Sequence, residues 1–165
     1  MFKRYKKMPQ PKKQHIESIK RTLQIFWIDF LKISQLTTEL PSVKDKVIAD
    51  KTNEYAEKFL SRYRTEFHKI SRNLWPESKE LSDQIMLGLT TFELWLENCN
   101  NIITHIDSED TTTQRFSETY NNLIKTGREL SNDMNEQIYA PYRQLIHALG
   151  ISDSEFQAWL MRRSS

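Results

Sequence analysis

Apolar side chains recur along the chain at the three- and four-residue spacings of an amphipathic helix. The clearest row keeps a seven-residue repeat for more than three periods: Leu81, Ile85, Gly88, Phe92, Trp95, Cys99, Ile102 and Ile106. A second row one position over, formed by Leu89, Leu96 and Ile103, makes this apolar face wider than a two-stranded coiled coil needs. A face of this width is typical of a helix inside a bundle.

The same periodicity continues on both sides of this row and predicts five helices in all. Prolines, a glycine and capping residues separate them, with Pro41, Pro76 and Gly150 at three of the boundaries. Pro141 is expected to kink or restart the fourth helix. The expected helices cover about residues 14–39, 42–75, 79–107, 112–149 and 153–162.

These helices predict an all-α fold. We expect a mainly antiparallel bundle of four long helices plus a short C-terminal helix, because the helices are long and their connections are short. The bundle is expected to form one domain over residues 14–165, since 165 residues suffice for one continuous core. Residues 1–13 carry too little apolar surface to fold alone and are expected to form a basic flexible arm.

Two glycines lie inside apolar rows rather than at turns. Gly88 belongs to the row described first, and Gly127 to a later row within residues 116–134. A glycine in a helix interior costs about 1 kcal/mol relative to alanine, so a compensating contact is expected. We predict that another helix, or a large ring such as Trp27 or Trp95, approaches closely at both glycines.

Composition narrows the class of protein. Cys99 is the single cysteine, which excludes an intramolecular disulfide framework and fits a reducing compartment. No apolar run approaches the ~20 residues of a transmembrane helix. The basic N-terminus is not followed by the apolar segment of a secretory signal. We therefore expect a soluble, cytoplasmic protein.

Charge is distributed unevenly along the chain. Residues 1–21 carry eight Lys or Arg and one acidic residue, Glu17, whereas residues 22–165 carry sixteen basic and twenty-one acidic side chains. The first segment therefore has a net charge of +7 and the rest a net charge of −5. Six of the eight cations belong to the arm: Lys3, Arg4, Lys6, Lys7, Lys12 and Lys13. The arm is a candidate contact for phosphates or another acidic surface.

A second group of cations recurs on the second expected helix, roughly opposite its apolar row: Lys44, Lys51, Lys58, Arg62, Lys69 and Arg72. Cations spread along a helix face can follow the phosphates of a polyanion. Glu54 and Glu66, however, lie at ion-pair spacing from Lys58 and Lys69, so a solvated surface is the competing interpretation. The third helix carries the opposite charge on its outer face: Glu80, Asp83, Glu93 and Glu97.

This charge pattern favours a binding role. We expect a non-catalytic interaction or assembly subunit that binds an acidic partner through the arm and the outer face of the second helix. The partner is a protein or a larger complex, and the backbone of a nucleic acid is the alternative polyanion. The acidic third helix would allow the bundle to bridge an acidic and a basic partner. A bundle that coats an apolar surface is a further class, although its apolar rows are regular enough to pack internally.

Motifs of catalytic chemistry are missing from the sequence. A ferritin-like di-metal site needs Glu-x-x-His pairs, and none of the four histidines has a glutamate at that spacing. The chain also lacks a G-x-S-x-G elbow, a Walker loop and a G-x-G-x-x-G loop. We therefore expect no enzymatic activity, no cofactor and no bound metal.

One local alternative concerns Arg62 and His68 in the segment RYRTEFH. This segment resembles the R-x(4-6)-H pattern of the HEPN ribonucleases, helical proteins in which the arginine and the histidine act on the RNA phosphodiester. The resemblance covers seven residues and would imply a ribonuclease. The chain departs from the pattern at Tyr63, where the family usually has a polar residue. A regular helix also places Arg62 and His68 about 120° apart.

A second alternative concerns the C-terminal segment 145–163, which resembles a helix-turn-helix. Its apolar positions and its glycine follow that pattern: Leu145, Leu149, Gly150, Ile151, Phe156 and Trp159. The resemblance would imply a DNA-binding regulator, with Arg162 and Arg163 at the end of the unit. Two features depart from it: Ile146 replaces a small residue, and Asp153 and Glu155 begin the second helix. A structural cap on the bundle is the competing interpretation.

Overall fold

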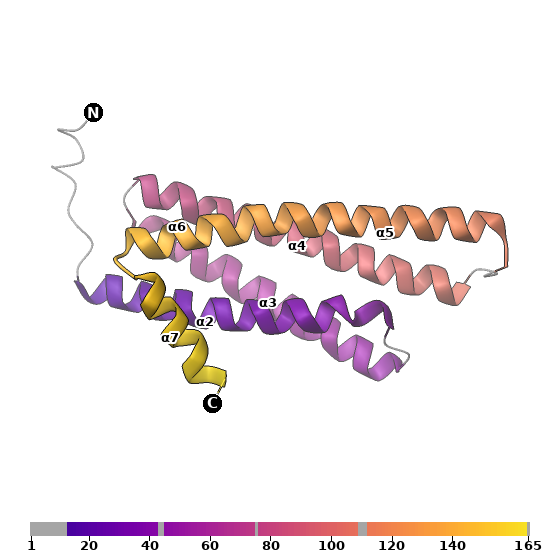
Figure 1. The fold of residues 1–165 in the computed structure, drawn as a ribbon, viewed down its shortest axis with the longest axis horizontal. Helices are drawn as coiled ribbons and strands as arrows, with labels where there is room; N and C mark the ends of the chain where they lie inside the picture. Colours follow the sequence, from indigo (N-terminus) through magenta and orange to yellow (C-terminus); the bar gives the residue numbers. More distant parts are fainter. Residues whose placement is uncertain (1–12, 43–44, 75, 109–111, 165) are drawn as a thin grey trace.

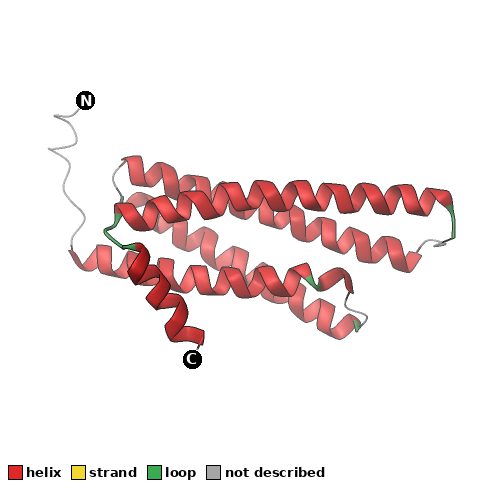
Figure 2. Cartoon of the chain, in the orientation of Figure 1, coloured by secondary structure: helices red, strands yellow, loops and turns green. Residues whose placement is uncertain are grey.

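The computed structural model describes residues 13–42, 45–74, 76–108 and 112–164. These residues are almost entirely helical and include no strand (Figure 2). Four long helical segments run alongside one another, and a short helix crosses one end of them (Figure 1). The predicted fold class, an all-α bundle of four long helices plus a short C-terminal helix, is confirmed.

The helices follow the predicted order. The first two long helices are α2 (Lys13–Thr38) and α3 (Lys46–Arg72), connected by the 3₁₀ turn η1 (Leu40–Ser42). The third is α4 (Pro76–Ser108). The fourth long segment consists of α5 (Gln114–Met134), the π-helical turn η2 (Asn135–Tyr139) and α6 (Ala140–Ala148). The short C-terminal helix is α7 (Asp153–Ser164).

Two helices begin three or more residues away from the predicted start. α3 begins at Lys46 rather than at residue 42, because the Asp45 carboxylate accepts a hydrogen bond from the Val47 N–H at 2.9 Å and caps the helix. α4 begins at Pro76, a favourable first residue because its missing N–H would have no partner in the first turn. Ser78, the residue before the predicted start, is buried within that turn.

The fourth long segment changes its helical geometry immediately before Pro141. Proline has no N–H to donate to the carbonyl four residues earlier, and the π-helical turn η2 occupies that stretch. The Gln137 side chain of this turn accepts a hydrogen bond from the Thr91 hydroxyl of α4. The π-helical turn therefore marks the expected restart and ties the segment to α4.

α4 lies at the centre of the bundle. It packs against α3 on one side and against α5, η2 and α6 on the other. A Cβ on Gly88 would overlap the Ile138 side chain, and one on Gly127 would lie 3.0 Å from Asn98 Nδ2. Both glycines therefore lie where another helix approaches closely, as predicted. The neighbouring side chains are Ile138 and Asn98 rather than tryptophan rings.

Aromatic side chains join α2, α6 and α7 at one end of the bundle. The Trp27 and Tyr142 rings are stacked with centroids 4.6 Å apart, and the Phe156 ring lies 5.9 Å from Trp27. The Tyr142 hydroxyl donates a 2.7 Å hydrogen bond to the Leu23 carbonyl, and burial raises the pKa of Tyr142 above its ordinary value. α7 is thereby packed against the bundle through Phe156.

Candidate interaction surfaces

The predicted cations of α3 are displayed on one exposed side of that helix. The five that the structure describes are all exposed: Lys51, Lys58, Arg62, Lys69 and Arg72. They span about 32 Å at a rise of 1.5 Å per residue. We call this set the α3 cation row.

The side chains of the other predicted cations lie outside the described residues. Lys3, Arg4, Lys6, Lys7, Lys12 and Lys44 belong to segments that the structure leaves undescribed, and Lys13 begins α2 without a described side chain. Among the predicted cations, the α3 cation row therefore contains all those whose side chains the structure describes.

Two members of the α3 cation row form short-range ion pairs along the helix. Lys58 Nζ lies 3.1 Å from Glu54, and Lys69 Nζ lies 3.9 Å from Glu66. Exposed pairs of this kind contribute about 0–1 kcal/mol each, so a phosphate or carboxylate of a partner can replace them. Lys51 forms no ion pair within the described part of the chain.

Arg62 occupies a more fixed position at the contact between α2 and α3. Its guanidinium lies 3.7 Å from the Asp29 carboxylate and 5.1 Å from the centroid of the Tyr63 ring. Asp29 also accepts a 2.5 Å hydrogen bond from the Tyr63 hydroxyl. Burial, followed by this hydrogen bond, raises the pKa of Tyr63 above its ordinary value. Arg62 therefore helps to join the two helices.

Arg62 and His68, the two residues of the HEPN-like pattern, have different partners. Arg62 pairs with Asp29, whereas the His68 Nε2 atom lies 2.9 Å from a guanidinium nitrogen of Arg72. The structure thus does not join the two side chains in one hydrogen-bonded pair. The described residues also contain no group of three histidine, cysteine, aspartate or glutamate side chains placed to hold a metal ion.

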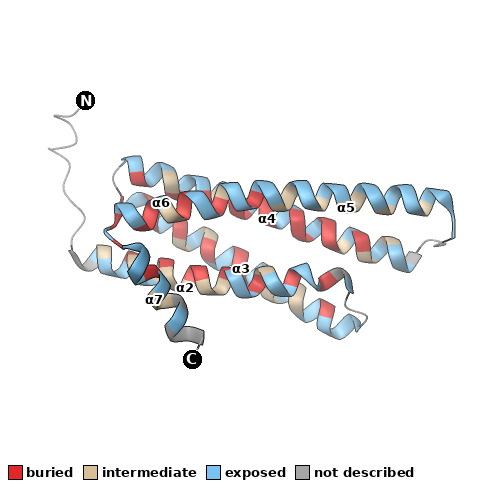
Figure 3. Cartoon of the chain, in the orientation of Figure 1, coloured by how far each residue is buried: buried red, intermediate tan, exposed pale blue. Residues whose placement is uncertain are grey.

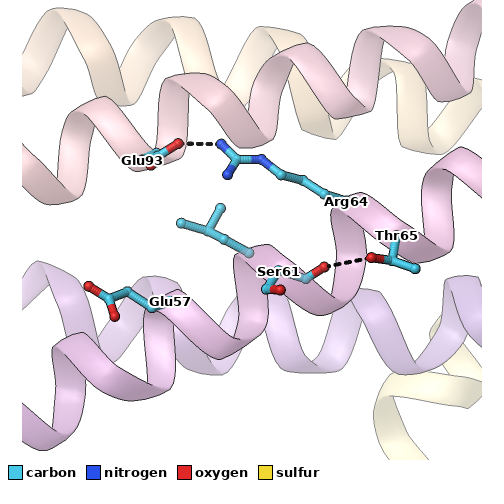
Figure 4. A pocket seen from close by; sticks show the side chains of 6 residues that line it. Glu57, Ser61, Arg64, Thr65 and Glu93 are labelled. Atoms are coloured by element: carbon cyan, nitrogen blue, oxygen red, sulfur yellow. Dashed lines mark hydrogen bonds and ion pairs between the residues drawn. The ribbon is translucent and has the colours of Figure 1, made fainter.

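A shallow groove runs along the surface where α3 and α4 meet (Figure 4). It is lined by Glu57, Leu60, Ser61, Arg64, Thr65 and Glu93. Arg64 reaches from α3 across the groove and forms an ion pair with Glu93 of α4. The Thr65 hydroxyl donates to the Ser61 main-chain carbonyl at 3.1 Å. The groove contains no nucleophile held by a general base, so its walls supply polar contacts and one apolar side chain.

The outward side of α4 carries a second seven-residue pattern, opposite the buried row. Its members alternate spacings of three and four, and all are exposed: Glu80, Asp83, Leu87, Thr90, Leu94, Glu97 and Asn101. We call them the α4 outer row. Leu87 and Leu94 are 57% and 50% exposed. Sequence reasoning identified acidic residues on this face but missed both leucines, although their seven-residue separation was visible in the sequence.

The C-terminal helix-turn-helix-like unit is held together by an acidic residue. Asp153, at the start of α7, pairs with Arg143 at 2.6 Å and with His147 at 3.2 Å. The Tyr139 hydroxyl is the main cause of a raised pKa at Arg143. Gly150 forms the turn with a φ of +83°, where a glycine is favoured. The side chains of Arg162 and Arg163 lie outside the described residues.

The same unit presents unfavourable chemistry to a nucleic acid. Asp153 and Glu155 are both exposed in the first turn of α7, the part of a recognition helix that would approach phosphates and bases. Phe156 is buried, and its ring lies close to those of Trp27 and Tyr142. These contacts favour a packing role for α7.

Two further observations bear on what this chain can bind. No helix in the described part of the chain is long and apolar enough to cross a membrane. Comparison of the chain with protein-family models, with curated proteins and with solved structures finds no match.

Proposed function

We propose that this chain is a non-catalytic interaction or assembly subunit that binds an acidic partner through its basic N-terminal arm and the α3 cation row. The observation that supports this most directly is the exposure of all five described cations along one side of a single helix. The proposed location is the cytoplasm, which the single, buried Cys99 supports.

The ion pairs of the α3 cation row are compatible with this role. Lys58 and Lys69 are exposed and pair with glutamates of their own helix, and such solvent-accessible pairs are weak. A carboxylate of an acidic partner can therefore replace the glutamate at each lysine at a low cost in free energy. Arg62 and Arg72 are engaged by Asp29 and His68, so we assign most of the binding to Lys51, Lys58 and Lys69.

Phosphates and carboxylates could both pair with the α3 cation row, and binding titrations distinguish them. The full-length chain is titrated against a labelled 20-nucleotide RNA and a labelled polyglutamate peptide, each at 50 and 200 mM salt. Phosphate binding should weaken steeply over this range, because each neutralised phosphate of a single strand contributes about −0.7 to the slope of log K against log salt.

A matched pair of triple variants locates the contact. We expect Lys51→Gln/Lys58→Gln/Lys69→Gln to weaken binding of the preferred probe at least tenfold and to reduce the salt slope. The control Lys79→Gln/Lys125→Gln/Arg128→Gln removes the same charge from exposed sites on α4 and α5. Equal weakening by both variants, or no binding of either probe at 50 mM salt, would overturn the proposal.

A further inference from the structure

We propose that the α4 outer row docks a basic amphipathic helix of a protein partner. The inference is independent of the α3 cation row, because it uses a different helix and the opposite charge. It starts from Leu87 and Leu94, which lie one heptad apart on the outward side of α4. Two turns of helix separate them, about 10.5 Å, the spacing at which a partner helix also repeats its apolar side chains.

The surroundings of the two leucines suit a helix. Thr90 lies between them on the same side of α4, and the α3–α4 groove runs along the Glu93 side (Figure 4). Leu60 contributes an apolar wall to this groove, and Ser61 and Thr65 contribute small polar ones. A partner helix placed on the row would cover both leucines and extend one flank into the groove.

The charges around the leucines identify the chemistry of the partner. Glu80 and Asp83 precede Leu87 in the row, and Glu97 follows Leu94. Glu57 adds a carboxylate from the far wall of the groove, while Arg64 is neutralised by Glu93. Carboxylates of the row therefore lie at both ends of the apolar centre, and Glu57 lies along one side. At the N-terminal end, Arg72 and Lys79 line a pocket together with Glu80 and Asp83. A helix with lysines or arginines beside its apolar row complements this surface.

A second copy of this chain fits the surface poorly. A two-fold contact that places Leu87 of one copy against Leu94 of the other would bring Glu97 beside Gln84 and Asp83 of the second copy. Like charges would then meet at both ends of the interface. The α3 cation row of a second copy has the right charge, but no large apolar side chain is exposed between Lys51 and Arg72.

Two synthetic helices test the proposal directly. The first is a labelled 21-residue peptide with leucines at heptad spacing and lysines flanking them, and the second has glutamates in place of the lysines. We expect the full-length protein to bind the lysine peptide saturably and the glutamate peptide at least tenfold more weakly. Glu80→Lys/Glu97→Lys should abolish this preference, because it neutralises the end of the row that carries Asp83 and reverses the charge of the other end.

The leucines are tested with matched variants at exposed sites. Leu87→Gln/Leu94→Gln should weaken binding of the lysine peptide at least tenfold, whereas Leu31→Gln/Leu36→Gln on α2 should leave it unchanged. Leu31 and Leu36 are 45% and 37% exposed, so both variants change accessible leucines. The proposal is overturned if the lysine peptide fails to bind or if both leucine variants weaken it equally. The proposal is also overturned if sedimentation shows that the wild type is a dimer and that Leu87→Gln/Leu94→Gln is a monomer. That result would mean that a second copy of the chain covers the α4 outer row.

Discussion

α4 and α5 carry the same kind of seven-residue apolar row, but only α4 buries it. In α4, Ile85, Phe92 and Cys99 are buried, whereas Met134 is the only buried residue of α5 (Figure 3). α4 has helical neighbours on both sides, while the extensive contacts of α5 are with α4 and η2. An apolar row therefore predicts a helix and the face it turns inward. The number of neighbouring helices decides how deeply that face is buried.

The largest expected effect comes from truncating one phenylalanine in each row. Phe92 is fully buried, so Phe92→Ala should lower the free energy of unfolding by about 3–5 kcal/mol through lost burial and a residual cavity. Phe116 is half-buried and stacks on His105 with ring centroids 4.4 Å apart. Phe116→Ala should cost about 1–2 kcal/mol, because less apolar surface returns to water. Urea unfolding monitored by circular dichroism measures both values.

Equal destabilisation of the two variants would contradict the difference in burial between α4 and α5. That result would mean that α5 is covered in solution by something other than α4, for example by another copy of the chain. Repeating the unfolding at a tenfold lower protein concentration identifies this case, because an intermolecular cover is lost on dilution.

Local sequence features predicted much of the fold. Thr113 caps α5 by accepting from the Phe116 N–H at 3.1 Å, and Ser152 accepts from the Glu155 N–H at 3.2 Å. Both caps could be read from a few neighbouring residues. The start of α3 was predicted wrongly because Pro41 and Asp45 are both good start signals. Choosing between them depends on how the chain turns between two packed helices.

Alanine substitutions at the two in-row glycines give the next largest effect, and the two sites differ in its size. Gly88→Ala should destabilise the protein by about 1–3 kcal/mol, because the new Cβ overlaps the Ile138 side chain in a packed interior. At Gly127 the nearest atom is Asn98 Nδ2, at 3.0 Å on a side chain that also donates to the Leu123 carbonyl. Gly127→Ala should change stability by less than about 1 kcal/mol, since the gain in helix propensity offsets a small shift of the amide.

Thermal unfolding of the two alanine variants measures this difference. An unchanged melting temperature for Gly88→Ala would contradict the close contact between α4 and η2. Strong destabilisation by Gly127→Ala would show that Asn98 cannot move and that α5 is fixed more firmly than its exposure indicates.

The candidate surfaces were predictable in part. Helical periodicity alone placed the cations of α3 on an exposed side, and the glutamate partners of Lys58 and Lys69 followed from their spacing. The pairing of Arg62 with Asp29 was not predictable, because Asp29 comes from another helix and their contact depends on packing. The spacing of Leu87 and Leu94 is visible in the sequence, but their exposure could not be predicted from it. It depends on which side of α4 the neighbouring helices leave uncovered.

The smallest expected effect concerns Cys99 and the pH dependence of stability. Burial in the α4 row raises the pKa of the Cys99 thiol from its ordinary value near 9 to about 11. The folded protein therefore retains this proton between these pH values while the unfolded chain loses it. This contribution to stability is fully present below pH 9 and falls as the pH rises towards 11, by about 1 kcal/mol between pH 7 and pH 9.5.

Cys99→Ala isolates this contribution, because lysines and tyrosines titrate in the same range. The wild type should lose about 1 kcal/mol more than Cys99→Ala between pH 7 and pH 9.5. A cysteine placed in the α5 row, Leu123→Cys in the Cys99→Ala background, tests the same difference between α4 and α5. Leu123 is only half-buried, so its replacement should ionise closer to pH 9 and react with iodoacetamide at least tenfold faster than Cys99 at pH 8. Equal reaction rates would show that the two rows are equally accessible, and the contrast between α4 and α5 would fail.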